Sequence, residues 1–219
     1  MKVKEFLWRG CGLIDEKLRL DYDLQHFLIL SKKNIRDHAV IRMIISTLCS
    51  EEELIHVSKK DFRRMRGKSE YYTVKFKNRL SPVDKKTFEI VQKLPDKPFE
   101  MDPRDVNEIV SKYSPPDRKY DAKKLKKAVE TILRDAALYD VNFEKLSIEE
   151  KFEFMLDFNP IYSDVWDEDS EGFEEFIRNY AKVSKLSAEE ISKEFGEDVE
   201  KVKKVLKKRS LLSFSEELV

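Results

Sequence analysis

Helix-start signals recur along this 219-residue chain and constrain its fold more than any other feature. Capping boxes, in which a serine precedes a glutamate by three residues, begin at Ser50, Ser147 and Ser187. Ser81-Pro82 and Asp102-Pro103 each place a cap residue before a proline at the first helical position. Only 5 glycines and 7 prolines are present to interrupt regular structure. We therefore expect a mainly helical protein.

Two segments refine this fold class. The stretch Ala39–Leu48 is apolar nearly all round, which is typical of a buried central helix. In contrast, Tyr71–Phe76 is rich in β-formers, lacks a helical stripe and follows a turn-like Arg66-Gly67-Lys68-Ser69. A lone hairpin is marginally stable, so we expect a β-hairpin near residues 68–79 that lies on the helical core. The expected class is α+β, mainly α with a small hairpin or sheet.

The C-terminal part has its own pattern. A short helix should stop at Gly196 and a second should follow at once, with the small Ser192 where the two cross. We therefore expect a three-helix helix-turn-helix domain over residues 172–219, an acidic linker at 163–171 and a main domain at 1–162. The second helix begins with acids and continues with lysines. Contact with DNA and packing on the main domain or on a partner both remain open for this unit.

Basic residues are concentrated in three runs, although Lys+Arg and Asp+Glu both total 43. Nine bases and two acids lie in 59–79, seven and two in 112–127, and six and none in 201–209. Aromatic residues Phe62, Tyr71, Tyr72 and Phe76 are interleaved in the first run. Segregated basic charge favours a polyanionic partner such as nucleic acid, and a solvated face is the alternative for each run.

Several classes of protein are disfavoured. No apolar run approaches the roughly 18 residues of a membrane span, and residues 1–9 lack the apolar core of a signal peptide. Cys11 and Cys49 cannot form a disulfide framework or a zinc site alone. We therefore expect a cytoplasmic protein with no membrane partner, no metal and no cofactor. The abundance of Lys and Glu resembles the surface of a thermophile's protein.

Local phrases of the sequence resemble a known family. Residues 47–54 (TLCSEEEL) look like the motif Thr-Gly-Leu-Arg-x-x-Glu-Leu, and residues 120–126 (YDAKKLK) look like a His-x-Leu-Arg box. Pro98-Phe99 followed by Val106-Asn107 looks like the segment before that second box. In layout, residues 30–162 resemble the catalytic domain of tyrosine recombinases, the phage and archaeal integrases.

The resemblance implies roles for individual residues. In that family a tyrosine attacks a DNA phosphate, two arginines neutralise the developing charge and a lysine protonates the leaving oxygen. The first arginine falls on Ser50, and a later His or Trp position falls near Glu153. The resemblance assigns the nucleophile to Tyr162. It assigns the His-x-x-Arg pair to Lys123 and Lys126, and the hairpin lysine to Lys75 or Lys77. Lysine cannot form the bidentate clamp of arginine, so the resemblance implies a recombinase fold retained for DNA binding without catalysis.

Three hypotheses follow. The first is a non-catalytic DNA-binding protein. The second is an active strand transferase that uses Tyr162 with Lys77, Lys123 and Lys126. The third is a protein-interaction module, a homo-oligomer in which the acidic stretch 164–175 pairs with basic faces. The first hypothesis assigns DNA contacts to Lys59, Lys60, Arg63, Arg64, Arg66, Lys68, Lys75, Lys77, Lys123, Lys126, Lys127, Lys201, Lys203, Lys204 and Lys207.

Overall fold

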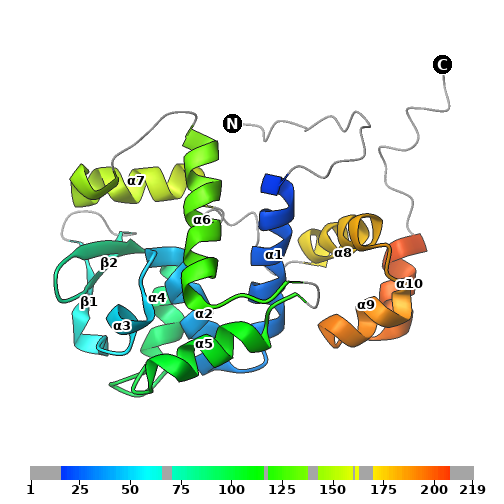
Figure 1. Ribbon diagram of the computed structural model, residues 1–219, viewed down its shortest axis with the longest axis horizontal. Coiled ribbons are helices and arrows are strands. Elements are labelled where there is room, and N and C mark those ends of the chain that lie inside the picture. The colour runs from blue at the N-terminus through cyan, green and yellow to red at the C-terminus, as the bar shows by residue number, and fades with distance from the viewer. Residues whose placement is uncertain are drawn as a thin grey trace.

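The protein is mainly α-helical with one small antiparallel sheet, as expected (Figure 1). A computed structural model describes residues 16–65, 71–115, 118–137, 143–159, 161–162 and 170–207. The elements are α1 (Glu16–Ser31), α2 (Ile35–Thr47), α3 (Glu51–Leu54), η1 (Lys59–Asp61), β1 (Phe62–Arg64), β2 (Tyr72–Lys75), β3 (Leu80–Val83), α4 (Lys85–Gln92), α5 (Pro103–Lys112), α6 (Ala122–Ala137), η2 (Phe143–Lys145), α7 (Ile148–Phe158), α8 (Ser170–Ser184), α9 (Ala188–Phe195) and α10 (Val199–Lys207).

Helix α2 is the central element, and the prediction of a buried helix there is confirmed. Every residue from Asp37 to Thr47 is buried, and the helix contacts α1, α4, α5, α6 and β3. The Asn34 side chain caps its start by accepting hydrogen bonds from two backbone N–H groups. Its end is marked by Leu48, whose φ of 54° is left-handed. Burial on all sides explains why the segment is apolar all round.

The serine capping boxes are formed at all three expected positions, and Asp102 forms a fourth. The expectation for Ser81-Pro82 is wrong, because Leu80–Val83 forms strand β3 instead of a helix start. Helix α4 begins later, after Asp84, whose carboxylate accepts from the Thr87 N–H. Proline is tolerated at this position because β3 is an edge strand, where the missing N–H is not needed for a ladder.

The sheet has the order β1-β2-β3 and two different faces. Phe62 pairs with Val74 and Tyr72 pairs with Val83, and these four side chains enter the core. On this face Tyr72 stacks on Phe88 of α4 with ring centroids 4.4 Å apart. On the opposite face, Tyr71 stacks on Phe152 of α7 at 3.8 Å. The sheet therefore lies between α4 and α7 (Figure 1).

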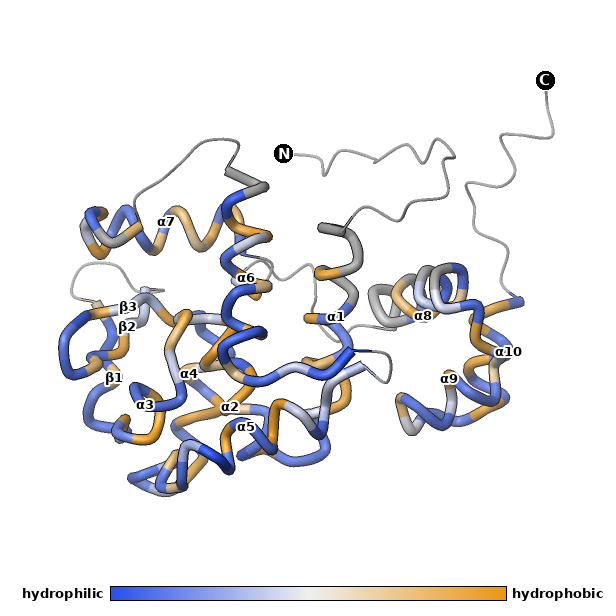
Figure 2. Tube along the Cα trace, viewed as in Figure 1, coloured by the Kyte–Doolittle hydropathy of each residue, from blue (hydrophilic) through white to orange (hydrophobic). Residues whose placement is uncertain are grey.

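Two hydrophobic clusters hold the described part of the chain together. The larger cluster runs from α1 to α7 and includes Tyr162. The smaller one joins α8, α9 and α10 around Phe176, Ile177, Ile191, Phe195, Val202 and Val205. Figure 2 shows hydrophobic and hydrophilic positions alternating along α9 and α10, as amphipathic helices require. Helix α1 serves both clusters, since Leu24 and Phe27 belong to the larger one and Ile29 and Leu30 pack on the smaller one.

The three C-terminal helices occur in the expected order. Helix α9 ends at Gly196, which adopts a φ of 62°. The Ser192 hydroxyl donates a 2.7 Å hydrogen bond to the Glu197 carbonyl across the turn into α10. The expected linker falls on residues 163–169, which lie outside the described residues, and on the first two residues of α8.

Candidate nucleic-acid interface

Six expected DNA-contacting residues lie on or beside the first two strands, and we call this set the basic sheet surface. It comprises Lys59, Lys60, Arg63, Arg64, Lys75 and Lys77. All are exposed except Lys59, which is half-buried. Antiparallel pairing of β1 with β2 brings residues from 59–64 beside residues from 75–77. Arg66 and Lys68 lie outside the described residues.

Carboxylates do not pair with five of these six residues within the described part of the chain, and Arg64 is the exception that takes part in a further interaction. Asp61, the one acid in residues 59–65 and 71–79, accepts hydrogen bonds from the Ser58 N–H at 2.9 Å and the Ser58 hydroxyl at 2.6 Å. Among the described residues, no ion pair engages Lys59, Lys60, Arg63, Lys75 or Lys77. The surface therefore concentrates positive charge in a way that suits a polyanion.

The aromatic residues interleaved in this run are not surface groups. Phe62 is 7% exposed, Tyr72 8% and Phe76 3%, while Tyr71 is covered by Phe152. Alternate residues of a strand point to opposite faces, and helices pack on both faces of this sheet, so these rings are packed against helices. These rings are therefore not available to stack on nucleic-acid bases. The groups of this surface that can contact a ligand are its exposed basic side chains.

Arg79 has a structural role that the sequence did not reveal. Its Nε donates to Glu53 Oε1 at 2.7 Å and its Nη2 donates to Oε2 at 2.9 Å. The same guanidinium donates to the carbonyls of Thr47 and Leu48. Burial alone would raise the Glu53 pKa, but the hydrogen bonds from Arg79 and from the Ser50 N–H lower it below the usual value. Arg79 thus ties the β2–β3 turn to the start of α3.

The residues that the recombinase resemblance assigns to catalysis lie on different elements. Ser50 caps α3, Lys77 is exposed in the β2–β3 turn, and Lys123 is exposed in the first turn of α6. Lys126 lies close enough to influence the pKa of Glu53 and approaches Glu130 at 3.9 Å. Lys127 is exposed on the same helix.

Tyr162 lies in the core, with 8% of its surface exposed. Its hydroxyl donates to the Ser46 carbonyl at 3.0 Å and lies 3.3 Å from the Ser46 hydroxyl. Burial, and secondly the charge of Asp84, raise the pKa of this phenol well above its ordinary value. Such a group is neither ionised near neutral pH nor accessible to a phosphate in this structure.

A buried ion pair lies beneath the sheet. Arg42 donates to Asp84 Oδ1 at 2.6 Å and to the Thr87 hydroxyl at 2.9 Å. Arg42 is the one charged residue in Ala39–Leu48. A single arginine in a helix that is otherwise uncharged and buried predicts a buried acidic partner. The partner's identity depends on the packing of α4 against α2, which the sequence does not reveal.

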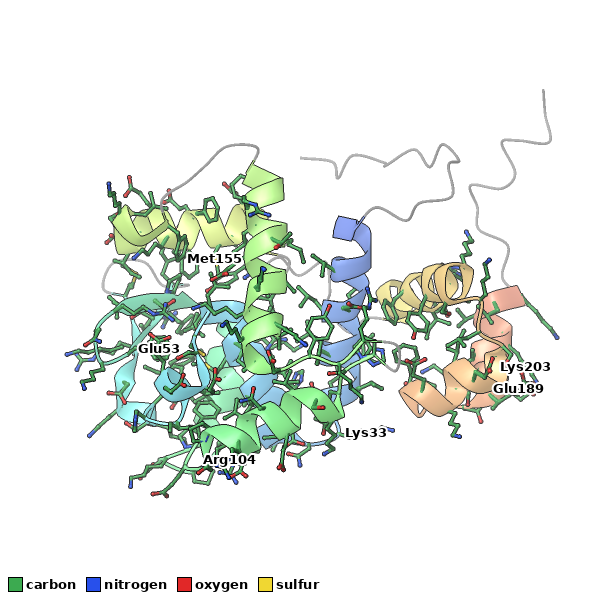
Figure 3. All side chains as sticks on the ribbon, in the orientation of Figure 1. Lys33, Glu53, Arg104, Met155, Glu189 and Lys203 are labelled. Carbon is green, nitrogen blue, oxygen red and sulfur yellow. The ribbon has the colours of Figure 1, made fainter. Side chains whose placement is uncertain are left out.

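Helix α10 carries its lysines among carboxylates. Lys203 Nζ lies 3.0 Å from Glu189 of α9 and 3.4 Å from Glu200, and Figure 3 labels Lys203 and Glu189 side by side. The hydrogen bond with Glu189 is the main cause that raises the Lys203 pKa. Lys201 pairs with Glu197 at 2.9 Å. Lys204 and Lys207 are exposed without an ion pair among the described residues.

The described residues contain neither a metal-binding cluster nor a membrane-spanning helix. No group of three or more His, Cys, Asp or Glu side chains among them could hold a metal ion. The Cys49 thiol is fully buried, and burial raises its pKa to about 11. None of the helices that can be described is long and apolar enough to cross a membrane.

Comparison with known proteins identifies a relative of this chain in an archaeon. No protein-family model matches the sequence. An uncharacterized protein of Archaeoglobus fulgidus is 50% identical over 206 residues, which cover 90% of this chain and 97% of that protein. The chain belongs to the same family as this archaeal protein.

Proposed function

We propose that this protein binds DNA through the basic sheet surface and neither cuts nor rejoins it. The observation that carries the proposal is that Lys60, Arg63, Lys75 and Lys77 are exposed on β1, β2 and their flanks and that no ion pair engages them among the described residues. Lysine and arginine bind backbone phosphates and release condensed counterions, which gives affinity without sequence preference. A cytoplasmic location, expected from the sequence, is part of the proposal.

A recombinase-like fold for residues 30–162 is also part of the proposal. The resemblance implies a buried helix, a short helix, a basic hairpin and a later basic helix, and α2, α3, the sheet and α6 occur in that order. Leu48 stands where the family's motif has glycine, and its φ of 54° is a conformation that glycine adopts most readily. This agreement of backbone and motif supports the resemblance.

The inferred absence of catalysis is supported by three sites. Ser50 occupies the position of the first arginine and is engaged as a helix cap. Lys126 occupies the position of the second arginine and lacks its bidentate geometry. The Tyr162 hydroxyl is hydrogen-bonded inside the core. Loss of one charge-stabilising group costs about 10²–10³ in rate, so loss of both arginines leaves little strand transfer.

A salt titration tests the proposal. The full chain is titrated with a labelled duplex at about 50 mM and at about 200 mM salt. If the protein makes about four phosphate contacts, the affinity should be roughly 100-fold lower at the higher salt. Affinity that does not change with salt, or no binding at the lower salt, would contradict the proposal.

A matched pair of variants locates the contact. The variant Arg63→Glu/Lys77→Glu should lower the affinity for DNA about 100-fold. The slope of log affinity against log salt should also fall by the amount expected for the loss of about two phosphate contacts. The control Lys85→Glu/Arg104→Glu removes the same charge from exposed positions on α4 and α5 and should have a much smaller effect. Equal losses in the two variants would mean that net charge alone governs binding.

A suicide duplex tests the inferred absence of catalysis. A tyrosine strand transferase leaves a covalent adduct on such a nicked substrate, and we expect none for this chain. An adduct that Tyr162→Phe abolishes would establish the strand-transferase hypothesis instead.

A further inference from the structure

Two exposed leucines lie on elements that contact each other near the sheet. Leu80 is 42% exposed on β3 and Leu156 is 44% exposed on α7. Helix α7 packs on β3, so both leucines belong to the same region of the molecule (Figure 1). Their surroundings carry charge of opposite sign.

The first leucine lies among bases on the face of the sheet turned away from α4. Leu80 is opposite Lys75 in the register of β2 and β3. Arg63 is opposite Thr73, and residues 73 and 75 share a face because strand side chains alternate. Tyr71 shares that face too and is covered by Phe152 of α7. Leu80, Lys75 and Arg63 are exposed and form what we call the open sheet face.

The second leucine lies among acids. Glu149, Glu153, Leu156 and Asp157 are spaced i, i+4, i+7 and i+8 on α7, so they follow one strip of the helix. All four are exposed, and we call them the acidic strip. Met155, labelled in Figure 3, is buried on the side of α7 that packs on the rest of the protein. The acidic strip therefore belongs to the outer surface of the helix.

We infer that a second copy of this chain docks here, with the acidic strip of one protomer on the open sheet face of its partner. Each surface presents one leucine beside charges that complement those of the other surface. Every copy carries both surfaces on neighbouring elements, and in the arrangement that we infer a two-fold axis repeats the contact and closes a dimer. Leu156 meets Leu80 at the centre, and the ion pairs form the rim that sets orientation.

The dimer is a separate interaction from DNA binding, and dimer formation limits DNA binding. Arg63 and Lys75 belong both to the open sheet face and to the basic sheet surface. A second copy and a DNA backbone therefore compete for the same side chains.

Sedimentation equilibrium of the full chain tests the dimer. At low salt the mean mass should rise with protein concentration from 26.0 kDa toward twice that value, and high salt should lower it. Leu156→Ser should weaken the dimer at least tenfold. A mass of one chain at every concentration overturns the inference, and so does a mass that grows past the dimer, because an open chain of contacts has no two-fold axis.

A charge exchange identifies the contact. Glu153→Lys/Asp157→Lys makes the strip basic, and Arg63→Glu/Lys75→Glu makes the sheet face acidic. Each variant alone should be monomeric, because like charges meet in its homodimer. An equimolar mixture should recover a dimer, because both contacts of the mixed pair join opposite charges again.

Two control variants carry the same charge changes elsewhere. Glu89→Lys/Glu108→Lys and Lys85→Glu/Arg104→Glu reverse exposed residues on α4 and α5. Each control should dimerise like the unaltered chain. Failure of the charge-exchanged mixture to dimerise, while these controls do, overturns the inferred contact. Because mass is measured without DNA, this outcome is independent of the DNA-binding proposal.

Discussion

The basic sheet surface and the C-terminal helices α8–α10 hold similar numbers of bases but differ in their acids. Residues 59–65 and 71–79, which hold the six bases of this surface and Arg79, contain seven bases and one acid, whereas residues 170–207 contain eight bases and nine acids. Along the sequence, the run at 201–209 is the purer basic one. In the fold, Glu189 of α9 reaches Lys203, and Glu197 of the turn reaches Lys201. A run of lysines becomes a basic surface only where folding brings no carboxylates to it.

The same two regions differ in how they are stabilised. The larger cluster contains 34 buried apolar residues, and the smaller contains six. The smaller cluster also depends on α1, which contributes Ile29 and Leu30 from outside α8–α10. We call the part of the protein around the larger cluster, from α1 to α7, the body. We therefore expect α8–α10 to need the body in order to stay folded, and the body to stay folded without α8–α10. The predictions below test this asymmetry and the asymmetry of charge.

The largest effect is expected at the buried ion pair of the body. Asp84→Asn keeps an acceptor for the cap of α4 but leaves Arg42 buried without its carboxylate, at a cost of about 4 kcal/mol. Urea unfolding followed by circular dichroism measures this loss, and α8–α10 should unfold with the body. The double variant Arg42→Met/Asp84→Asn should regain part of the stability, because no unpaired charge remains. A double variant less stable than Asp84→Asn would contradict this reasoning.

A smaller and more local effect is expected in the smaller cluster. Phe195 contacts the rings of Phe176, Tyr180 and His26 at centroid distances of 5.4, 5.0 and 5.3 Å. Phe195→Ala should cost about 3 kcal/mol and release α8–α10 while α2 stays protected. Hydrogen exchange resolved by residue measures both regions at once. Equal loss of protection in α2 would show that the two regions fold as one unit.

A pH-dependent effect of about 1 kcal/mol is expected at the edge of the basic sheet surface, where Glu53 meets Arg79. The Glu53 pKa is lowered in the folded protein, so its contribution is full above the unfolded value near 4.5 and is lost as pH falls through the folded value. Glu53→Gln keeps the capping box but removes the charge. The two chains should differ in urea midpoint at pH 7 and converge in acid. A difference that persists below the folded pKa would point to packing instead.

The smallest effect is expected on α10. Lys204→Glu/Lys207→Glu should change DNA affinity by less than about twofold, because Lys201 and Lys203 of the same helix already pair with Glu197 and Glu189 and little net positive charge remains on α10. The binding titration that measures the sheet variants measures this one. A loss as large as that of Arg63→Glu/Lys77→Glu would show that α10 shares the DNA contact equally and would break the comparison.

Local signals predicted much of the fold, and long-range contacts account for the rest. Helix starts were predictable because a cap serine and its glutamate lie three residues apart in the sequence. Ser81-Pro82 was misassigned because a proline suits an edge strand as well as a helix start. The candidate site was predictable only as a run of bases. The sequence alone shows neither the Arg79–Glu53 pair nor the salt bridge from Glu189 to Lys203, because each joins different elements.

Helix α1 also sets an order of events during synthesis. Its Ile29 and Leu30 leave the ribosome early, but their partners on α8–α10 follow about 140 residues later. At elongation rates of roughly 5–20 residues per second, that face of α1 is exposed for about 7–28 s before α8–α10 can cover it. During this interval the body can complete its own packing on the other face of α1. The last three helices can then pack on a helix whose other contacts are already made.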